Sequence, residues 1–231
     1  MFQTFSTLRK KFLSCLIALL SLLSGSLAVA HPHLWIDAKV VLGFDADGQL
    51  SEIRQTWMFD EMFSSYAALG TDKKEKGVPD QSELEKIRNN WMTALADPMS
   101  TYFTSASMGD KAIKLGDASS SSIEWNRKDK RIVLHFTLPV SPPVKPTTDP
   151  ILINIADPTY FVAYDLTRAD SVTMQAAPSG CKASFVQRNP LDEETMKKLA
   201  AIPANAGALP PDILKLTQEI QNRIELACTK G

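Results

Sequence analysis

The chain has 231 residues, of which 25 are Lys or Arg, 26 are Asp or Glu and 44% are hydrophobic. A surface that binds nucleic acid carries a clear excess of basic residues, so this composition argues against a nucleic-acid partner. About 200 residues are enough for one substantial hydrophobic core or two small ones.

Residues 1–30 have the pattern of a secretory signal peptide. Three basic residues at positions 9–11 precede an apolar run over 12–23, which is too short to span a bilayer, and a small-x-small motif ends at Ala30. We interpret 1–30 as a cleaved signal, so that His31 begins the mature chain. The cleavage would remove three basic residues and no acidic one, which leaves a net charge of −4.

The mature N-terminus would then gather nitrogen donors for a metal ion. His31 would carry both a free α-amine and an imidazole, and His33 would add a third nitrogen two residues later. Pro32 favours an extended backbone, in which side chains at i and i+2 share a face. The motif therefore predicts a transition-metal site at His31 and His33, to which Asp37 is a candidate addition.

Cleavage after Ala28 is an alternative, because the three residues before that cut also fit the small-x-small pattern. Val29, Ala30 and His31 would then offer amine, amide and imidazole nitrogens in one plane, which suits Cu(II) or Ni(II). Either cut predicts a metal site near His31, but with different geometry.

The first third of the chain reads as a β-hairpin followed by helices. Apolar residues alternate over 33–44, a turn falls at 45–48, and 50–59 returns as a second strand. A short helix is expected over 62–69 and a loop over 71–80. Helical spacing of apolar residues predicts a longer helix over 81–96, which ends at Asp97-Pro98.

Short strands are expected to dominate the rest of the chain, over 111–115, 122–126, 131–138, 151–155, 160–166, 171–175 and 183–187. The serine run at 119–122 is expected to be a loop. Five prolines within 139–150 predict a stiff extended connection and not a strand.

Two helices are expected at the C-terminus, over 191–201 and 211–227. Strands in series with helices segregated from them indicate an α+β fold with a largely antiparallel sheet. We therefore expect a single domain over 31–231, with an N-terminal hairpin, a helix after it and two C-terminal helices.

Two cysteines, Cys181 and Cys228, lie outside the predicted signal. An even pair in an exported chain indicates a disulfide. Closing this loop would stabilise the fold by about 4 kcal/mol on chain-entropy grounds. The bond would fix the predicted C-terminal helix to the rest of the domain.

Further candidate ligands lie outside the N-terminal motif. His135 shares the less apolar face of its strand with Val133 and Thr137, so it either completes a three-histidine site or lies on a solvated surface. Asp60 lies where a strand becomes a helix, and Asp157 precedes a proline. Both suit structural roles, as a helix cap and a turn residue, and both are also candidate metal ligands.

Five motifs are spread along the chain after residue 30: His31-Pro32-His33-Leu34-Trp35-Ile36-Asp37, Trp57-Met58-Phe59-Asp60-Glu61, Tyr102-Phe103-Thr104, Asp157-Pro158-Thr159-Tyr160-Phe161 and Gly180-Cys181. Together they resemble the domain-of-unknown-function 1007 family, and the opening His-Pro-His-x-Trp motif is the most specific of them. The resemblance implies a periplasmic component of an ABC-type transport system, linked to zinc, nickel or cobalt transport.

We therefore expect a periplasmic accessory protein that binds Zn(II), Ni(II), Co(II) or Cu(II) near His31 and His33 and works with inner-membrane metal transporter subunits. No hydrolase motif or phosphate-binding glycine loop is present, so we do not expect an enzyme. Two alternatives remain open. One is a copper enzyme in which His31 chelates the metal and His135 is the other arm, and the second is an assembly module that binds no metal.

Overall fold

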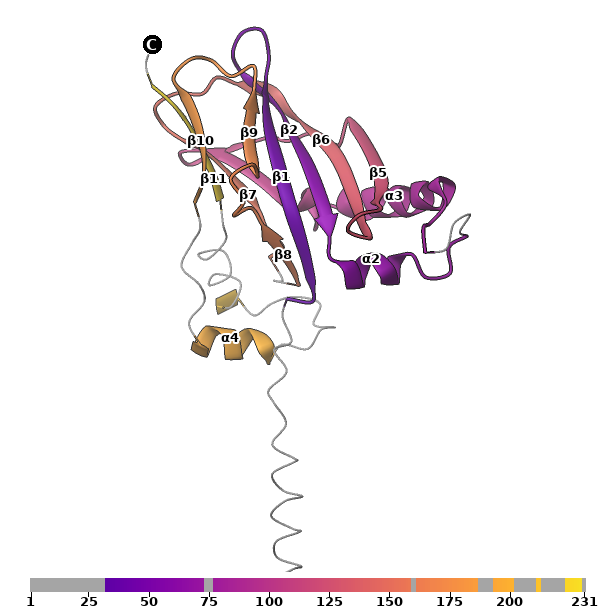
Figure 1. Ribbon diagram of the computed structural model, residues 1–231. Coiled ribbons are helices and arrows are strands. Elements are labelled where there is room, and N and C mark those ends of the chain that lie inside the picture. The colour runs from indigo at the N-terminus through magenta and orange to yellow at the C-terminus, as the bar shows by residue number, and fades with distance from the viewer. Residues whose placement is uncertain are drawn as a thin grey trace, which may run out of the picture.

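The computed structural model describes residues 32–72, 77–158, 161–186, 193–201, 211–212 and 223–229. Strands in these ranges form two sheets (Figure 1). One cluster of buried hydrophobic side chains contains residues from both sheets. The fold is therefore mixed α+β, built mostly from antiparallel strands.

The larger sheet has the strand order β5-β6-β2-β1-β8, with β9 also paired to β1. Its strands are β1 (Leu34–Phe44), β2 (Leu50–Phe59), β5 (Ser120–Asn126), β6 (Arg131–Val144), β8 (Val162–Asp165) and β9 (Val172–Gln175). The first four pair with one another in antiparallel fashion, whereas β8 and β9 run parallel to β1.

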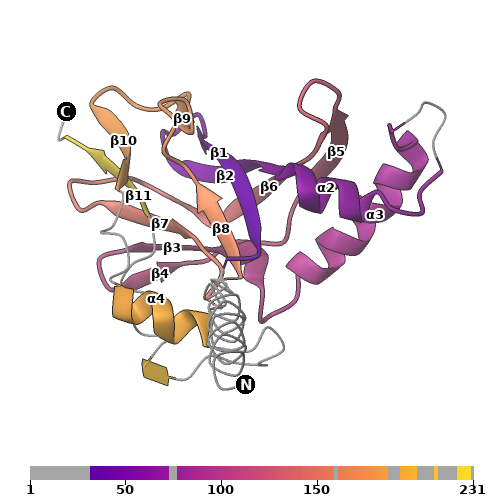
Figure 2. The same ribbon diagram turned by 60° about the horizontal axis from the view of Figure 1, so that its bottom comes forward.

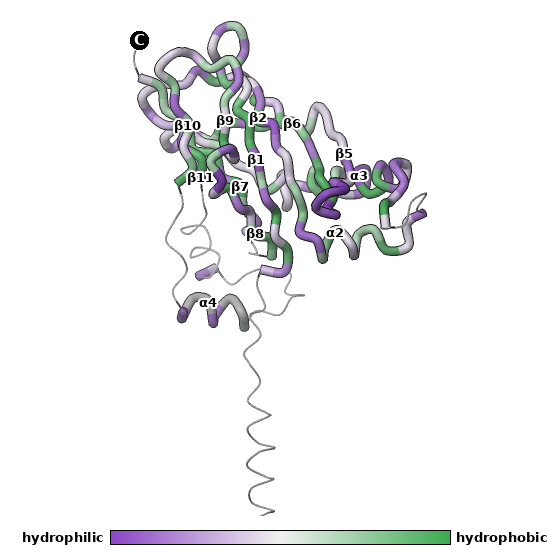
Figure 3. The backbone as a smooth tube through the Cα atoms, in the orientation of Figure 1, coloured by the Kyte–Doolittle hydropathy of each residue, from purple (hydrophilic) through white to green (hydrophobic). Residues whose placement is uncertain are grey.

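Alternation of apolar residues explains which face of β1 is buried. Five side chains at every second position are at most 6% exposed, and they are Leu34, Ile36, Ala38, Val40 and Leu42. The residues between them face outward. This alternation is visible along β1 in Figure 3. The two strands are joined by a turn in which Gly48 has φ +70°, a conformation that favours glycine.

The smaller sheet is antiparallel throughout and has the order β10-β11-β7-β3-β4. Its strands are β3 (Thr104–Met108), β4 (Lys111–Ile113), β7 (Ile151–Ile155), β10 (Cys181–Val186) and β11 (Arg223–Cys228). A buried polar contact joins the two sheets, because the Gln55 side chain on β2 donates a 2.8 Å hydrogen bond to the Thr104 hydroxyl on β3.

Three of the predicted helices are present, as α2 (Glu61–Ala67), α3 (Gln81–Leu95) and α4 (Glu193–Ala200). A short 3-10 helix, η1 (Thr101–Phe103), precedes β3. Figure 2 shows α3 beside the larger sheet, near β5. Within the described ranges, no helix is both long and apolar enough to cross a bilayer.

The helix predicted over 211–227 is wrong at its C-terminal end. Residues 211–212 are helical and 213–222 lie outside the described residues, but Arg223–Cys228 forms β11. This strand lies between β10 and β7, and its alternating Ile224 and Leu226 side chains are fully buried. Burial on alternate positions across six residues therefore outweighs the helical spacing that the longer segment suggests.

Two predicted connections are partly strand. Ser120–Asn126 forms β5, so three of the four serines in the run at 119–122 pair with β6. The β6 strand itself continues to Val144, through three of the five prolines expected to stiffen a connection. The pairing of β2 with β6 shifts register opposite this proline-bearing segment. A strand tolerates proline at such an irregularity because the regular hydrogen-bond ladder is interrupted there.

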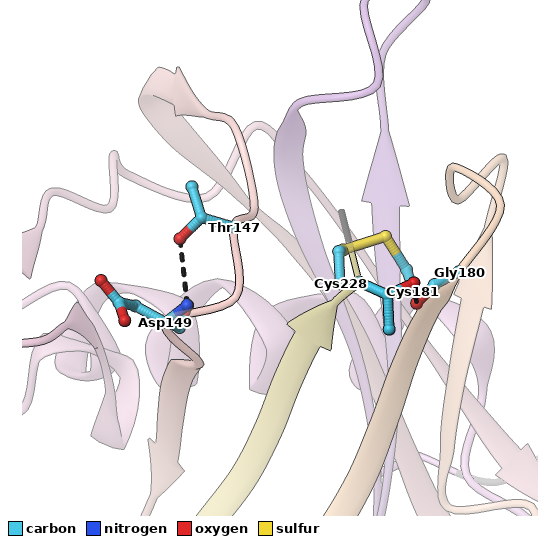
Figure 4. Close-up of a disulfide and its surroundings, with 6 residues drawn as sticks. Thr147, Asp149, Gly180, Cys181 and Cys228 are labelled. Carbon is cyan, nitrogen blue, oxygen red and sulfur yellow. Dashed lines mark hydrogen bonds between the residues drawn. A yellow bond between two sulfur atoms is a disulfide. The ribbon is translucent and has the colours of Figure 1, made fainter. Parts of the chain in front are cut away.

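The disulfide between Cys181 and Cys228 is present, and it joins two residues that are register partners on β10 and β11 (Figure 4). The Cys228 amide also donates a 3.1 Å hydrogen bond to the Thr147 carbonyl, and Thr147 in turn accepts one from the Asp149 amide at 3.2 Å. The disulfide therefore fixes the strand β11 to β10, and not the C-terminal helix that the sequence predicts. Such a bond fits a secreted protein.

Candidate functional site

His33 and Asp157 lie close to the same segment, at the point where β1 begins to pair with β8. The His33 amide donates a 2.9 Å hydrogen bond to the Phe161 carbonyl, and the centres of the His33 and Phe161 rings are 4.9 Å apart. The Asp157 carboxylate accepts a 3.1 Å hydrogen bond from the Val162 amide and is 5% exposed. An imidazole and a carboxylate predicted as ligands thus flank Phe161 and Val162.

Asp60 lies at the same end of β1 and has a structural role there. One carboxylate oxygen accepts a 2.8 Å hydrogen bond from the Phe63 amide, which caps α2. The other oxygen accepts one from the Trp35 amide at 3.1 Å, and the Asp60 amide donates to the Trp35 carbonyl at 2.9 Å. Asp60 therefore joins α2 to β1, and we leave it out of the proposed ligand set.

Replacing Asp60 with alanine should lower the free energy of unfolding by about 1–2 kcal/mol, because it removes the cap of α2 and a bond to β1. Urea unfolding followed by circular dichroism measures this change. Asp60→Asn is the control, since an amide oxygen still accepts a cap bond. If Asp60→Ala unfolds at the wild-type urea concentration, the structural role is refuted.

Asp37 is held by an arginine and does not join the site. Arg131 Nη1 lies 2.6 Å from an Asp37 carboxylate oxygen, across β2. The same guanidinium donates to the Met58 carbonyl at 2.9 Å and to the Phe59 carbonyl. The guanidinium already neutralises the negative charge of the Asp37 carboxylate, so this charge is not free to attract a metal ion.

The structure does not bring His135 to His33. His135 on β6 is opposite Thr56 on β2, which is opposite Lys39 on β1. Lys39 follows His33 by six residues, which corresponds to about 20 Å along an extended strand. His135 instead contacts the Thr56 hydroxyl at 2.9 Å through Nδ1 and lies 3.7 Å from Glu124 through Nε2. It belongs to a separate polar region on the outer face of the sheet.

His31 lies outside the described residues, so its position relative to His33 and Asp157 is not part of this geometry. Within the ranges that are described, no group of three or more His, Cys, Asp or Glu side chains is close enough to hold a metal ion. His33 and Asp157 provide two donors of suitable chemistry, an imidazole nitrogen and a carboxylate oxygen.

Two aromatic residues shape this end of the molecule: Phe161, which the sequence placed in a motif but gave no role, and Tyr164, which sequence reasoning missed. Phe161 is 38% exposed and contacts His33, whereas Tyr164 is 8% exposed and packs 5.0 Å from Trp57, measured between ring centres. The only sequence signal for Tyr164 was its place in a predicted strand. Its contact with Trp57 depends on the pairing of β8 with β1, which no local sequence pattern indicates.

A family model described as "Protein of unknown function (DUF1007)" matches residues 15–228. An uncharacterized protein of Haemophilus influenzae is 23% identical over 175 residues, which span 72% of this chain and 77% of that protein.

Proposed function

We propose a function for this chain, which belongs to the DUF1007 family. It is a periplasmic accessory protein that binds one divalent transition metal at the start of β1. The donors we assign are His33 and Asp157, together with the α-amine and imidazole that His31 gains when residues 1–30 are removed. The metal is Zn(II), Ni(II), Co(II) or Cu(II). The partners are inner-membrane metal transporter subunits, as the resemblance in the sequence implies.

One observation carries the proposal. His33 and Asp157 are 124 positions apart in the sequence, yet they contact adjacent residues, because the pairing of β1 with β8 places His33 against Phe161 while Asp157 accepts from the Val162 amide. Imidazole and carboxylate ligands together suit zinc and its first-row neighbours. The proposed N-terminal residue, His31, lies two residues before His33 and would supply the remaining donors without any further element of the fold.

The copper-enzyme alternative receives no such support. It requires His135 as the second arm of the metal site, and the strand register separates His135 from His33 by about 20 Å along β1. The assembly-module alternative, in which the histidines bind nothing, is the outcome that a failed metal titration would favour.

The test is calorimetric titration of the exported, processed protein with each of the four metals at neutral pH. We expect one equivalent to bind, and we expect His33→Ala or Asp157→Asn to weaken its affinity at least tenfold. Binding should also weaken as the pH falls, because imidazole and amine must lose protons to bind the metal.

His135→Ala is the matched control, since it removes a histidine from the same sheet without touching this end of β1. Mass spectrometry of the same sample defines the N-terminus. If a processed protein that begins at His31 binds none of the metals, or if His33→Ala binds as tightly as wild type, the proposed function is refuted.

A further inference from the structure

Large hydrophobic side chains are exposed at the end of the molecule where β1 and β8 begin and where α2 follows β2 (Figure 1). Six such side chains in the described part of the chain are between 38% and 83% exposed, and they are Trp35, Met62, Tyr66, Leu69, Met99 and Phe161. Isolated exposed hydrophobic residues are ordinary, but their concentration at one end of a molecule marks an interaction surface. We call these six residues the apolar end.

Three residues of the apolar end share the outward side of α2. Met62 and Tyr66 lie one turn apart on this helix, and Leu69 follows in the turn directly after it. Residues with spacings of four and three lie on the same side of a helix. The opposite side of α2 faces the protein, where Ser64 is fully buried.

The other three residues adjoin the start of β1. The amide and the carbonyl of Trp35 both bond to Asp60, the residue directly before α2. The Phe161 carbonyl accepts hydrogen bonds from the first residues of the β1 segment. Met99 lines a cavity together with Pro158, which lies three residues before Phe161. The six residues therefore belong to one region of the fold.

We propose that the apolar end rests on the surface of a lipid bilayer, with its aromatic side chains among the lipid head groups. Three of its six residues are Trp, Tyr or Phe. Trp and Tyr prefer this interface because their rings are apolar while their N–H or O–H group stays in contact with water. Such contact is peripheral and needs no spanning helix.

The chain before β1 favours a bilayer over another protein as the partner. Residues 12–23 are the apolar run of the predicted signal peptide, and ten residues, 24–33, join this run to β1. Ten residues span at most about 35 Å. A precursor with its apolar run in the membrane therefore holds this end of the fold close to the bilayer, and this is the end that carries the exposed hydrophobic residues.

Net charge indicates which force would drive the binding. Without residues 1–30 the chain has a net charge of −4, so attraction to anionic head groups does not contribute. Apolar contact with the interface is left as the driving force. We therefore expect binding to zwitterionic lipid, with little dependence on salt.

Flotation of the processed protein with phosphatidylcholine vesicles tests the proposal. We expect the wild-type protein to float with the vesicles to the same extent at low and high salt. Tyr66→Glu should lower the partition coefficient about tenfold, because a charge would have to enter the interface. Thr173→Glu is the matched control, since it adds the same charge at an exposed position on β9, opposite Val41 and about 20 Å along β1 from Trp35.

Vesicles of brominated phosphatidylcholine show which end makes contact, because bromine quenches the fluorescence of a nearby tryptophan. Trp35 belongs to the apolar end and is 49% exposed. We expect quenching in the wild-type protein and its loss in Trp35→Phe, which keeps an aromatic ring and should still float.

A wild-type protein that does not float, or a Tyr66→Glu variant that floats as well as Thr173→Glu, would overturn the proposal. So would a lipid-free dimer that Tyr66→Glu separates in sedimentation, because the surface would then be an interface between two copies of the chain. None of these outcomes bears on the metal titration, because the variants leave His33 and Asp157 unchanged.

Discussion

Replacing both cysteines, in the variant Cys181→Ser/Cys228→Ser, is expected to lower the free energy of unfolding by about 4 kcal/mol. The bond joins residues 47 positions apart, and opening a loop of that length restores conformational entropy to the unfolded chain. In a domain of about 200 residues this loss corresponds to a melting temperature lower by about 8–16 °C. Thermal unfolding followed by circular dichroism measures it.

The control is the wild-type protein reduced with a thiol under native conditions, which should match the double variant. β10 and β11 are paired over six residues, and we expect this pairing to persist without the bond, so both samples should keep the native spectrum at room temperature. A melting temperature within 2 °C of the oxidised wild type would contradict the assigned stabilisation.

The strands that could be predicted from the sequence have one face buried in the core and the other face directed outward. In β1 the buried Leu34 and Ile36 alternate with the outward Trp35 and Asp37, so the hydrophobicity of the sequence repeats every two residues, which indicates a strand. A one-residue shift would expose the whole apolar set, and this fixes the register of β1.

The errors occurred where non-local pairing decides the structure. The alternation in Arg223–Cys228 is too short to be recognised in the sequence within a longer segment of helical spacing, and it is the pairing with β10 and β7 that makes this segment a strand. Likewise the strand predicted over 122–126 is present, but it begins earlier, because Ser120 and Ser121 of the predicted loop also pair with β6. Propensity is weak evidence in segments whose hydrogen bonds come from distant parts of the chain.

The candidate site shows the same limit. The donor types of His33 and Asp157 were visible in the sequence, but their proximity depends on the parallel pairing of β1 with β8, which no local pattern predicts. Conversely, His135 has suitable chemistry and lies in the same sheet, yet strand register places it far from His33. Residue type alone indicated which side chains could bind a metal, but the strand pairing determines which of them lie near His33.

The second large effect concerns the polar group that joins the two sheets. Gln55 is 1% exposed, accepts a 2.9 Å hydrogen bond from the Trp57 indole and donates one to the Thr104 hydroxyl. Thr104 in turn donates to the Tyr102 carbonyl at 2.8 Å. Every member of this chain lies within the core, where a lost partner cannot be replaced by water without opening the structure.

Gln55→Leu should lower the free energy of unfolding by about 3 kcal/mol, because it removes two buried hydrogen bonds and leaves the Trp57 indole N–H unsatisfied at nearly constant volume. Urea unfolding measures the change. The double variant Gln55→Leu/Trp57→Phe has no unsatisfied indole N–H. Its loss of unfolding free energy should therefore be smaller than the sum of the losses in Gln55→Leu and in Trp57→Phe. Full additivity would contradict the assigned coupling between Gln55 and Trp57, because residues that share a buried hydrogen bond do not have independent effects. A loss below about 0.5 kcal/mol for Gln55→Leu would contradict the stabilising role of these buried hydrogen bonds as a whole.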